Sequence, residues 1–187
     1  MNKKDDYKQM YFEAIYKIED AKIQNFLNDC IKLIPEYFWT AFGSFTGKYH
    51  PPDENIEGGL ILHTLRVFQL CKHLAEMENL KSKEQNLLLA SALLHDTFRS
   101  GFIGRELRDK KGVIHTDGFH PLYPYWGFED AVSKYPNEGR SILQIISLHM
   151  GRWLIIKLSV DEPELTLGKL LHIADYLASR KNIKIEI

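Results

Sequence analysis

The segment from residue 83 to residue 96, KEQNLLLASALLHD, constrains the fold more than any other part of the chain. Its centre, LLLASALL, is apolar on nearly every side of a helix. A helix that is apolar all round has to be buried, because any exposed side would place leucines in water. The sequence therefore predicts a buried central helix, with Ser82 as its N-cap residue and the pair His95-Asp96 at its end.

Apolar residues at helical spacing predict further helices on both sides of this segment. No stretch shows the alternation of a strand, and the tail KNIKIEI is compatible with a short strand or a frayed end. The predicted fold is all-α, a compact bundle of about six to eight helices in one domain over residues 1–187. The expected helices are two within 5–33 with a break near residue 21, a short aromatic helix or turn after Pro35, then 60–77, 121–134, 140–149 and 164–180, with a turn at 136–139.

The composition restricts the partners. The 187 residues are 44% hydrophobic and 26% charged, as in a globular domain with a real core. A formal net charge of −1 gives no overall basic field, so duplex DNA is not an expected partner. No apolar run approaches a membrane span, and the N-terminal segment lacks the apolar stretch of a signal peptide. Cys30 and Cys71 are interpreted as core residues in a reducing compartment, so the expected location is the cytoplasm.

Histidine and aspartate side chains occur on helices that are otherwise apolar. His95 and Asp96 end the buried helix, His63 lies in the helix before it, and Asp175 lies on an apolar face of the last helix. A buried carboxylate without a partner is costly, and a metal ion beside imidazoles is a suitable partner. A single histidine of this kind is more often a hydrogen-bonded core residue, so the interpretation depends on the whole set. Such nitrogen and oxygen ligands suit zinc, iron, manganese or cobalt.

Three motifs surround these residues: GGLILHTLRV, ALLHDTFRSG and LLHIADYLASR. Their content and order resemble the HD-domain superfamily of metal-dependent phosphohydrolases. The resemblance covers about residues 35–182, the expected metal-binding core, and implies a compact helical fold. It also implies one metal ion held by His63, His95, Asp96 and Asp175.

Two further histidines resemble the extra ligands of the two-metal branch of this superfamily. They are His120 in GFHPLYP and His149 in SLHMGRW. His115 competes with His120, which is preferred because Pro121 marks a helix start that would hold the ligand rigidly. The resemblance then implies two divalent ions (Mn, Fe, Co, Ni or Zn) bridged by Asp96, with a single ion as the alternative.

The resemblance further implies that a metal-bound hydroxide cleaves a phosphoester or phosphoanhydride, with Asp96 at the centre of catalysis. The small size and near-neutral charge favour a small phosphorylated substrate, such as a nucleotide or a short nucleic-acid end. Two alternatives share the fold: a di-iron oxygenase that uses the same ligand set, and a non-catalytic binding module, which predicts degenerate ligands. The oligomeric state is open, and a homo-oligomer is compatible with the sequence.

Arginines near the predicted ligands are candidates for binding the phosphate group. Arg99 follows the His-Asp pair at a place where the family often has a lysine, and its guanidinium would offer two parallel hydrogen bonds. A nucleotidase branch has a glutamate there, so Arg99 argues against that branch. Arg152 and Arg180 follow the last two predicted ligands and are further candidates, although Arg180 is also interpretable as a solvated helix end.

Residues 43–59, GSFTGKYHPPDENIEGG, predict a long loop, because four glycines and two prolines forbid regular structure over most of it. Loops of this length in a compact domain are usually functional or disordered. GKYHPPDEN resembles a loop that precedes the first ligand in some family members, and a packed structural loop is the alternative. Tyr49 or Trp39 could stack on a base. The substrate-binding candidates in the loop are Lys48, Tyr49, His50 and Asn55.

Overall fold

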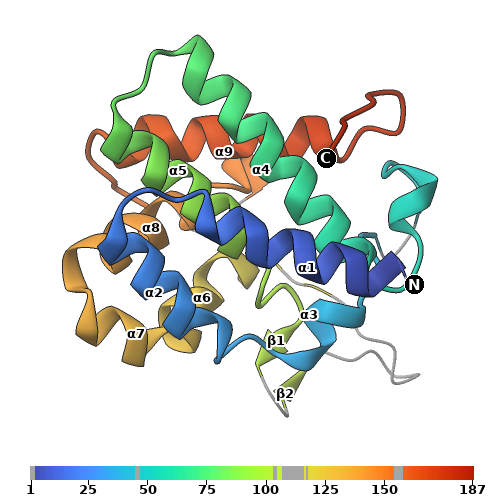
Figure 1. Ribbon diagram of the computed structural model, residues 1–187, viewed down its shortest axis with the longest axis horizontal. Helices are drawn as coiled ribbons and strands as arrows, with labels where there is room; N and C mark the ends of the chain where they lie inside the picture. Colours follow the sequence, from blue (N-terminus) through green and yellow to red (C-terminus); the bar gives the residue numbers. More distant parts are fainter. Residues whose placement is uncertain (1–2, 45–46, 103–104, 107–115, 117, 154–157) are drawn as a thin grey trace.

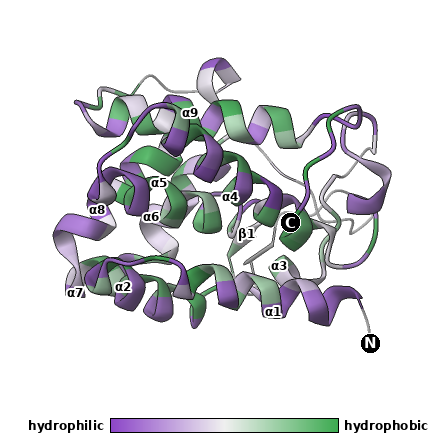
Figure 2. Ribbon diagram, turned by 45° about the horizontal axis from the view of Figure 1, so that its top comes forward, coloured by the Kyte–Doolittle hydropathy of each residue, from purple (hydrophilic) through white to green (hydrophobic). Residues whose placement is uncertain are grey.

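Helix α5 (Ser82–Leu94) lies at the centre of the molecule, as the sequence predicts. Every residue from Asn86 to Leu94 is buried. Helices α4 (Gly59–Met77), α8 (Pro136–Ser147) and α9 (Glu164–Ala178) all pack against it. Figure 2 shows hydrophobic ribbon gathered where these helices face one another. The apolar centre of α5 is therefore shielded from water on all of its sides.

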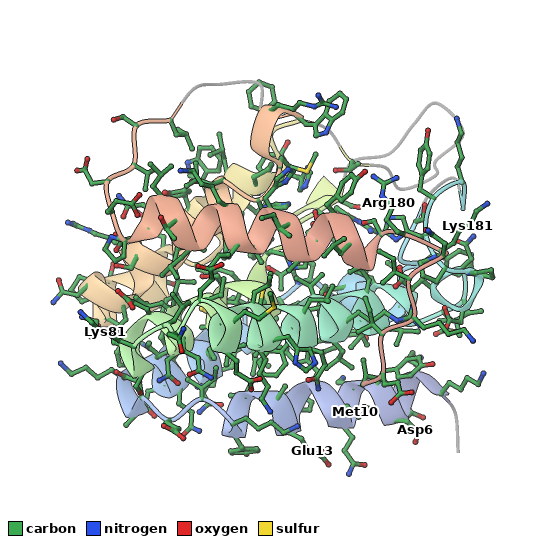
Figure 3. The ribbon with its side chains drawn as sticks, turned by 90° about the horizontal axis from the view of Figure 1, so that it is seen from above. Asp6, Met10, Glu13, Lys81, Arg180 and Lys181 are labelled. Carbon is green, nitrogen blue, oxygen red and sulfur yellow. The ribbon has the colours of Figure 1, made fainter. Side chains whose placement is uncertain are left out.

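The computed structural model describes residues 3–44, 47–102, 105–106, 116, 118–153 and 158–187. Within these ranges the fold is all-α, as predicted, with nine α-helices where six to eight were expected. Helix α4 packs against α9 on one side and against α1 on the other (Figures 1 and 3). The remaining elements are α1 (Lys3–Tyr16), α2 (Ala21–Ile31), α3 (Glu36–Thr40), η1 (Pro52–Glu54), β1 (Gly101–Phe102), β2 (Arg105–Glu106), η2 (His120–Leu122), α6 (Tyr123–Gly127), α7 (Glu129–Lys134) and η3 (Gly151–Trp153).

Several predicted boundaries were wrong. The single helix expected at 121–134 is divided into η2, α6 and α7. The break between α6 and α7 falls at Phe128, which leaves helical geometry and buries its ring completely in the core. The turn expected at 136–139 is the first turn of α8, in which Pro136 occupies a starting position that suits its fixed φ angle. Lys81, not Ser82, is the N-cap of α5, and its backbone N–H donates to Glu84 Oε2 at 3.0 Å.

The structure contains one pair of strands that the sequence did not indicate. Strands β1 and β2 pair antiparallel with Gly101 opposite Glu106, and each has only two residues. Two residues are too few for an alternating pattern to be visible in a sequence. The C-terminal tail forms no strand after α9, although Ile185 packs partly against the core.

The core is one cluster that draws on helices from both ends of the chain. Tyr11 on α1 is fully buried, and its hydroxyl donates to the carbonyl of Leu93 on α5 at 2.7 Å. Cys30 and Cys71 are buried and free, which agrees with the packing role predicted for them. In the described part of the chain, no helix has the length and apolar character that crossing a bilayer requires.

Helix α2 begins with a side-chain cap that gives a test of the fold. Asp20 Oδ1 accepts hydrogen bonds from the backbone N–H groups of Lys22 at 2.9 Å and Ile23 at 3.1 Å. Replacing Asp20 by alanine leaves both donors without this acceptor, so Asp20→Ala should lower the free energy of unfolding by about 1 kcal/mol. Urea denaturation followed by circular dichroism measures the change, and an unaltered midpoint would show that the cap contributes nothing.

Candidate metal centre

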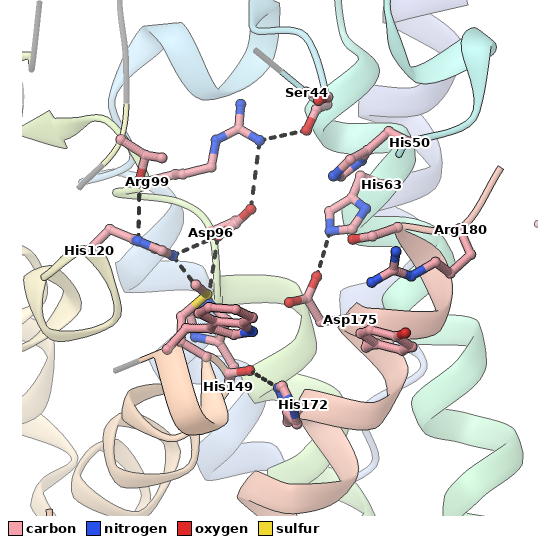
Figure 4. A pocket seen from close by; sticks show the side chains of 16 residues that line it. Ser44, His50, His63, Asp96, Arg99, His120, His149, His172, Asp175 and Arg180 are labelled. Atoms are coloured by element: carbon pink, nitrogen blue, oxygen red, sulfur yellow. Dashed lines mark hydrogen bonds and ion pairs between the residues drawn. The ribbon is translucent and has the colours of Figure 1, made fainter. Parts of the chain in front are cut away.

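Five of the six predicted metal ligands line one cavity (Figure 4). Nε2 of the sixth, His95, lies 3.9 Å from Asp96 and 4.0 Å from Asp175. The cavity has a volume of about 310 Å³, at the lower end of the range for small-molecule sites. Helix α5 ends at Leu94, so the chain turns immediately and directs the next two side chains inward. The ligands are His63 from α4, His95 and Asp96 from the turn after α5, His120 from the first residue of η2, His149 from the turn after α8, and Asp175 from α9.

Asp96 lies between two groups of side chains. Its Oδ1 is 3.7 Å from Nε2 of His120 and 3.7 Å from Nε2 of His149. Its Oδ2 is 3.9 Å from Nε2 of His95 and 3.8 Å from Nη1 of Arg99. Each carboxylate oxygen therefore faces a different set of partners.

Asp175 provides the second carboxylate of the site. Its Oδ1 is 3.0 Å from Nε2 of His63 and 4.0 Å from Nε2 of His95. Ligand atoms of His63, His95 and Asp96 all lie within 4.8 Å of one another, and so do those of Asp96, His120 and His149. These two groups share Asp96, and a third group, His50, Glu54 and His63, shares His63 with the first.

The imidazole rings are oriented by the nitrogen that faces away from the cavity. Nδ1 of His95 donates to the carbonyl of Ala92 at 2.8 Å, and Nδ1 of His149 donates to the carbonyl of Ile146 at 2.7 Å. A carbonyl can only accept, so Nδ1 carries the proton and Nε2 presents a lone pair to the site. Nδ1 of His120 lies 3.2 Å from the hydroxyl of Thr116. The carbonyl contacts of His95 and His149 fix both ring orientation and tautomer, as in metal ligands.

The donor atoms fit a bound cation. Nε2 of His95 is buried and has no hydrogen-bond partner among the described residues, although two carboxylates lie about 4 Å away. Nε2 of His120 and Nε2 of His149 are 3.3 Å apart and both lie 3.7 Å from Oδ1 of Asp96. Without a cation, the His120 ring can satisfy this contact by donating from Nε2 to His149, and with Nδ1 protonated instead, both lone pairs face Asp96. Lone pairs that converge on carboxylate oxygens repel one another unless a positive charge lies among them. Imidazole nitrogen with carboxylate oxygen is a donor set for divalent transition metals.

The electrostatics favour ionised carboxylates at this site. Burial acts to raise the pKa of Asp96, but the neighbouring imidazoles and Arg99 outweigh it and hold that pKa well below its usual range. Burial, together with the nearby His120 and His95, lowers the pKa of His149 to about 4. At neutral pH, Asp96 is therefore a carboxylate and His149 a neutral imidazole, which are the forms that bind metal.

The model of the HD domain family matches residues 60–180. The chain belongs to the HD domain family. HD domains are in general metal-dependent phosphohydrolases and bind divalent metal ions. The match includes all six predicted ligands of this HD domain but not the loop at 43–59, so it is narrower than the resemblance over 35–182. No match was found among curated proteins or among solved structures.

The arginines of this HD domain differ in what their side chains contact. Arg99 borders the cavity, but its guanidinium donates to the carbonyls of Phe42 and Gly43, both at 2.7 Å. Arg180 also borders the cavity, and its guanidinium carbon lies 3.9 Å from the ring centroid of Tyr176. Arg152 lies over the Trp153 ring at 4.8 Å and does not line the cavity. Of the two arginines that border the cavity, the guanidinium of Arg99 is thus bound to backbone carbonyls, whereas that of Arg180 makes no such bond within the described residues.

The predicted substrate-binding residues of the loop lie in different places. Only His50 lines the cavity, while Lys48, Tyr49 and Asn55 do not. Tyr49 is exposed and lies between the charged ends of Lys48 and Arg180, at 5.0 and 5.5 Å from its ring centroid. The suggestion that Trp39 stacks on a base was wrong, because Trp39 is buried against the aromatic rings of Tyr11, Phe12 and Phe38.

Two residues near the site were not predicted from the sequence. Glu54 is fully buried and its Oε2 lies 2.7 Å from Nδ1 of His50. His172, to which the sequence assigned no role, lines the cavity and donates from Nδ1 to the carbonyl of His149 at 2.6 Å. The spacing of His172 before Asp175 was the only available signal for it. His115, the competitor of His120, lies outside the described residues.

Proposed function

We propose that this HD domain hydrolyses a phosphoester or phosphoanhydride of a small phosphorylated molecule, such as a nucleotide or a short nucleic-acid end. The position of Asp96 carries the proposal, because its Oδ1 faces His120 and His149 while its Oδ2 faces His95. A carboxylate shared in this way suits a pair of adjacent divalent ions, which is a common arrangement in phosphoester hydrolysis. The size of the cavity favours a small substrate over a polymer.

Two divalent ions (Mn, Fe, Co, Ni or Zn) would be held by the six ligands in two groups. When bound, such ions lower the pKa of a coordinated water and neutralise charge on phosphoryl oxygens. Asp96 belongs to both groups. The first group is completed by His63, His95 and Asp175, and the second by His120 and His149.

Two arginines would have different tasks in this reaction. Arg180 would bind a phosphoryl oxygen, because it lines the cavity and its buried Nε has no hydrogen-bond partner among the described residues. Stacking on Tyr176 would hold its guanidinium in place. Arg99 would keep Asp96 ionised and hold the backbone at Phe42 against the site. This division changes the sequence-based hypothesis, in which Arg99 was the first candidate for the phosphate.

The role of Arg180 can be tested by removing its charge. Arg180→Met should lower kcat/KM by about 10- to 100-fold, mainly through KM, because one charge-assisted contact to the substrate is lost. The metal content should stay unchanged. Arg152→Met is the matched control, since Arg152 is exposed and lies outside the cavity. Equal kinetics for both variants would exclude Arg180 as a phosphate ligand.

The proposed function is tested by a screen for phosphate release. Protein purified without chelator is assayed with nucleoside phosphates, dinucleoside polyphosphates, cyclic nucleotides and short oligonucleotides, each with manganese, cobalt, nickel, iron or zinc. We expect metal-dependent hydrolysis that Asp96→Asn abolishes. Hydrolysis of none of these compounds with any of the five metals would contradict the proposal.

A further inference from the structure

Glu54 is a buried carboxylate that lies beside the predicted ligands without belonging to them. No part of it is accessible to solvent. Its Oε1 accepts a hydrogen bond from Nη1 of Arg66 at 2.6 Å, and its Oε2 accepts one from Nδ1 of His50 at 2.7 Å. A buried charge is retained only where partners compensate its lost hydration. Glu54 has such partners on both of its oxygens.

The backbone around Glu54 holds this carboxylate in a fixed place. Its carbonyl accepts a hydrogen bond from the N–H of Gly43 at 2.8 Å. On the other side, a Cβ at Gly59 would overlap the same carbonyl, so only glycine fits where α4 begins. The loop is therefore built against the start of the helix that carries His63.

The ring of His63 lies between two carboxylates. Its Nε2 faces the site and is 3.0 Å from Oδ1 of Asp175. Its Nδ1 is 3.5 Å from Oε2 of Glu54 and makes no hydrogen bond within the described ranges. A buried N–H without an acceptor is costly, and Oε2 of Glu54 is the acceptor that lies beside this nitrogen.

His63 differs in this respect from the other predicted histidine ligands. His95 and His149 donate from Nδ1 to neutral backbone carbonyls, and Nδ1 of His120 faces the hydroxyl of Thr116. Among the contacts of these four histidines with described residues, the carboxylate on that side is found at His63. A carboxylate hydrogen-bonded to the outer nitrogen of a ligand histidine orients the ring and increases the basicity of the inner nitrogen.

We propose that Glu54 is a positioning residue that accepts the Nδ1 proton of His63 and so directs Nε2 to a divalent cation. The inference rests on the proposed metal centre. It adds a residue from the loop at 43–59, which the family match does not include. His50 shares the same oxygen of Glu54 and lines the cavity, so the loop is joined to the site through this one carboxylate.

Calorimetric titration with Mn²⁺ tests the proposal without any substrate. Glu54→Gln should weaken the tighter Mn²⁺ binding step by about 10- to 100-fold, the usual effect of losing the partner of a ligand histidine. Asp53→Asn is the matched control. Asp53 also pairs with Arg66, at 2.7 Å, but it is exposed and does not contact His63. The Mn²⁺ affinity of Asp53→Asn should therefore equal that of the unmodified protein.

A second measurement uses the unmodified protein and does not depend on the variants folding. In the Zn²⁺-loaded protein, nitrogen-detected NMR of the His63 ring should show the proton on Nδ1. A proton on Nε2, or equal Mn²⁺ affinities for Glu54→Gln and Asp53→Asn, would overturn the role of Glu54. If the unmodified protein binds no Mn²⁺, the proposed metal centre itself fails, which is a separate result.

Discussion

Replacing Asp96 by asparagine should remove nearly all activity of this HD domain while leaving its fold intact. The amide keeps the shape of the side chain, but it loses the charge and puts an NH₂ group where one carboxylate oxygen faces the imidazoles. One proposed ion loses its oxygen ligand to the NH₂ group, and the other is left with a neutral amide oxygen in place of a charged one, since the two oxygens of Asp96 face different imidazoles. We expect kcat/KM to fall by roughly three orders of magnitude or more, as for other central members of a catalytic unit.

Metal analysis and phosphate release together measure this effect. The metal content of Asp96→Asn should fall below that of the unmodified protein, and circular dichroism should show the same helix content. Asp130→Asn is the control, because Asp130 is an exposed aspartate on α7, away from the cavity. An Asp96→Asn variant that retains a tenth of the activity would contradict the shared-carboxylate arrangement. Oxygen consumption by iron-loaded protein without phosphate release would point instead to oxygenase chemistry.

Replacing Arg66 by methionine should have the largest effect on stability. Arg66 is almost fully buried on α4, and its guanidinium bonds to Glu54 at 2.6 Å and to Asp53 at 2.7 Å. Methionine fills similar space but removes the guanidinium hydrogen bond to the buried carboxylate of Glu54. Breaking a buried ion pair from one side costs about 3–5 kcal/mol, and we expect a loss of that order in urea denaturation.

The loss caused by Arg66→Met should depend on pH. Burial acts to raise the pKa of Glu54, but His63, His50 and Arg66 outweigh it and hold that pKa well below its ordinary value. The stabilisation by the carboxylate is therefore fully present above the ordinary pKa and is lost as the pH falls. The difference in the free energy of unfolding between the unmodified protein and Arg66→Met should be largest near neutral pH and should decrease in acid. Arg140→Met, at an exposed position on α8, should change stability by less than about 0.5 kcal/mol.

The sequence was most informative about the helices whose apolar residues form a clear helical pattern. The burial of α5 followed from LLLASALL, because no other arrangement shields such a helix. It was least informative where local signals are ambiguous. Pro-Asn-Glu-Gly is as suitable for the first turn of a helix as for a turn, and in the structure it begins α8, where Gly139 lies close to Phe26 and Val132. The break at Phe128 likewise depends on a core contact with Phe98.

The six predicted ligands could be chosen because motif, spacing and family resemblance all pointed to them. Their neighbours could not, because those roles arise only when distant segments meet. Glu54 gains its role from Arg66 and His63, which are 12 and 9 residues away in the chain but adjacent in the structure. The same holds for Arg99, whose carbonyl partners at Phe42 and Gly43 lie more than 50 residues earlier.

The contact between His63 and Asp175 joins positions that are 112 residues apart in the chain. A cation held by both would act as a reversible cross-link that closes a loop of this length. For a covalent link of comparable span, the lost entropy of the unfolded chain corresponds to about 4–5 kcal/mol. Any ligand of the native state suppresses unfolding, so the supply of metal would then control the lifetime of the folded chain. The same supply would also control the rate of the proposed reaction.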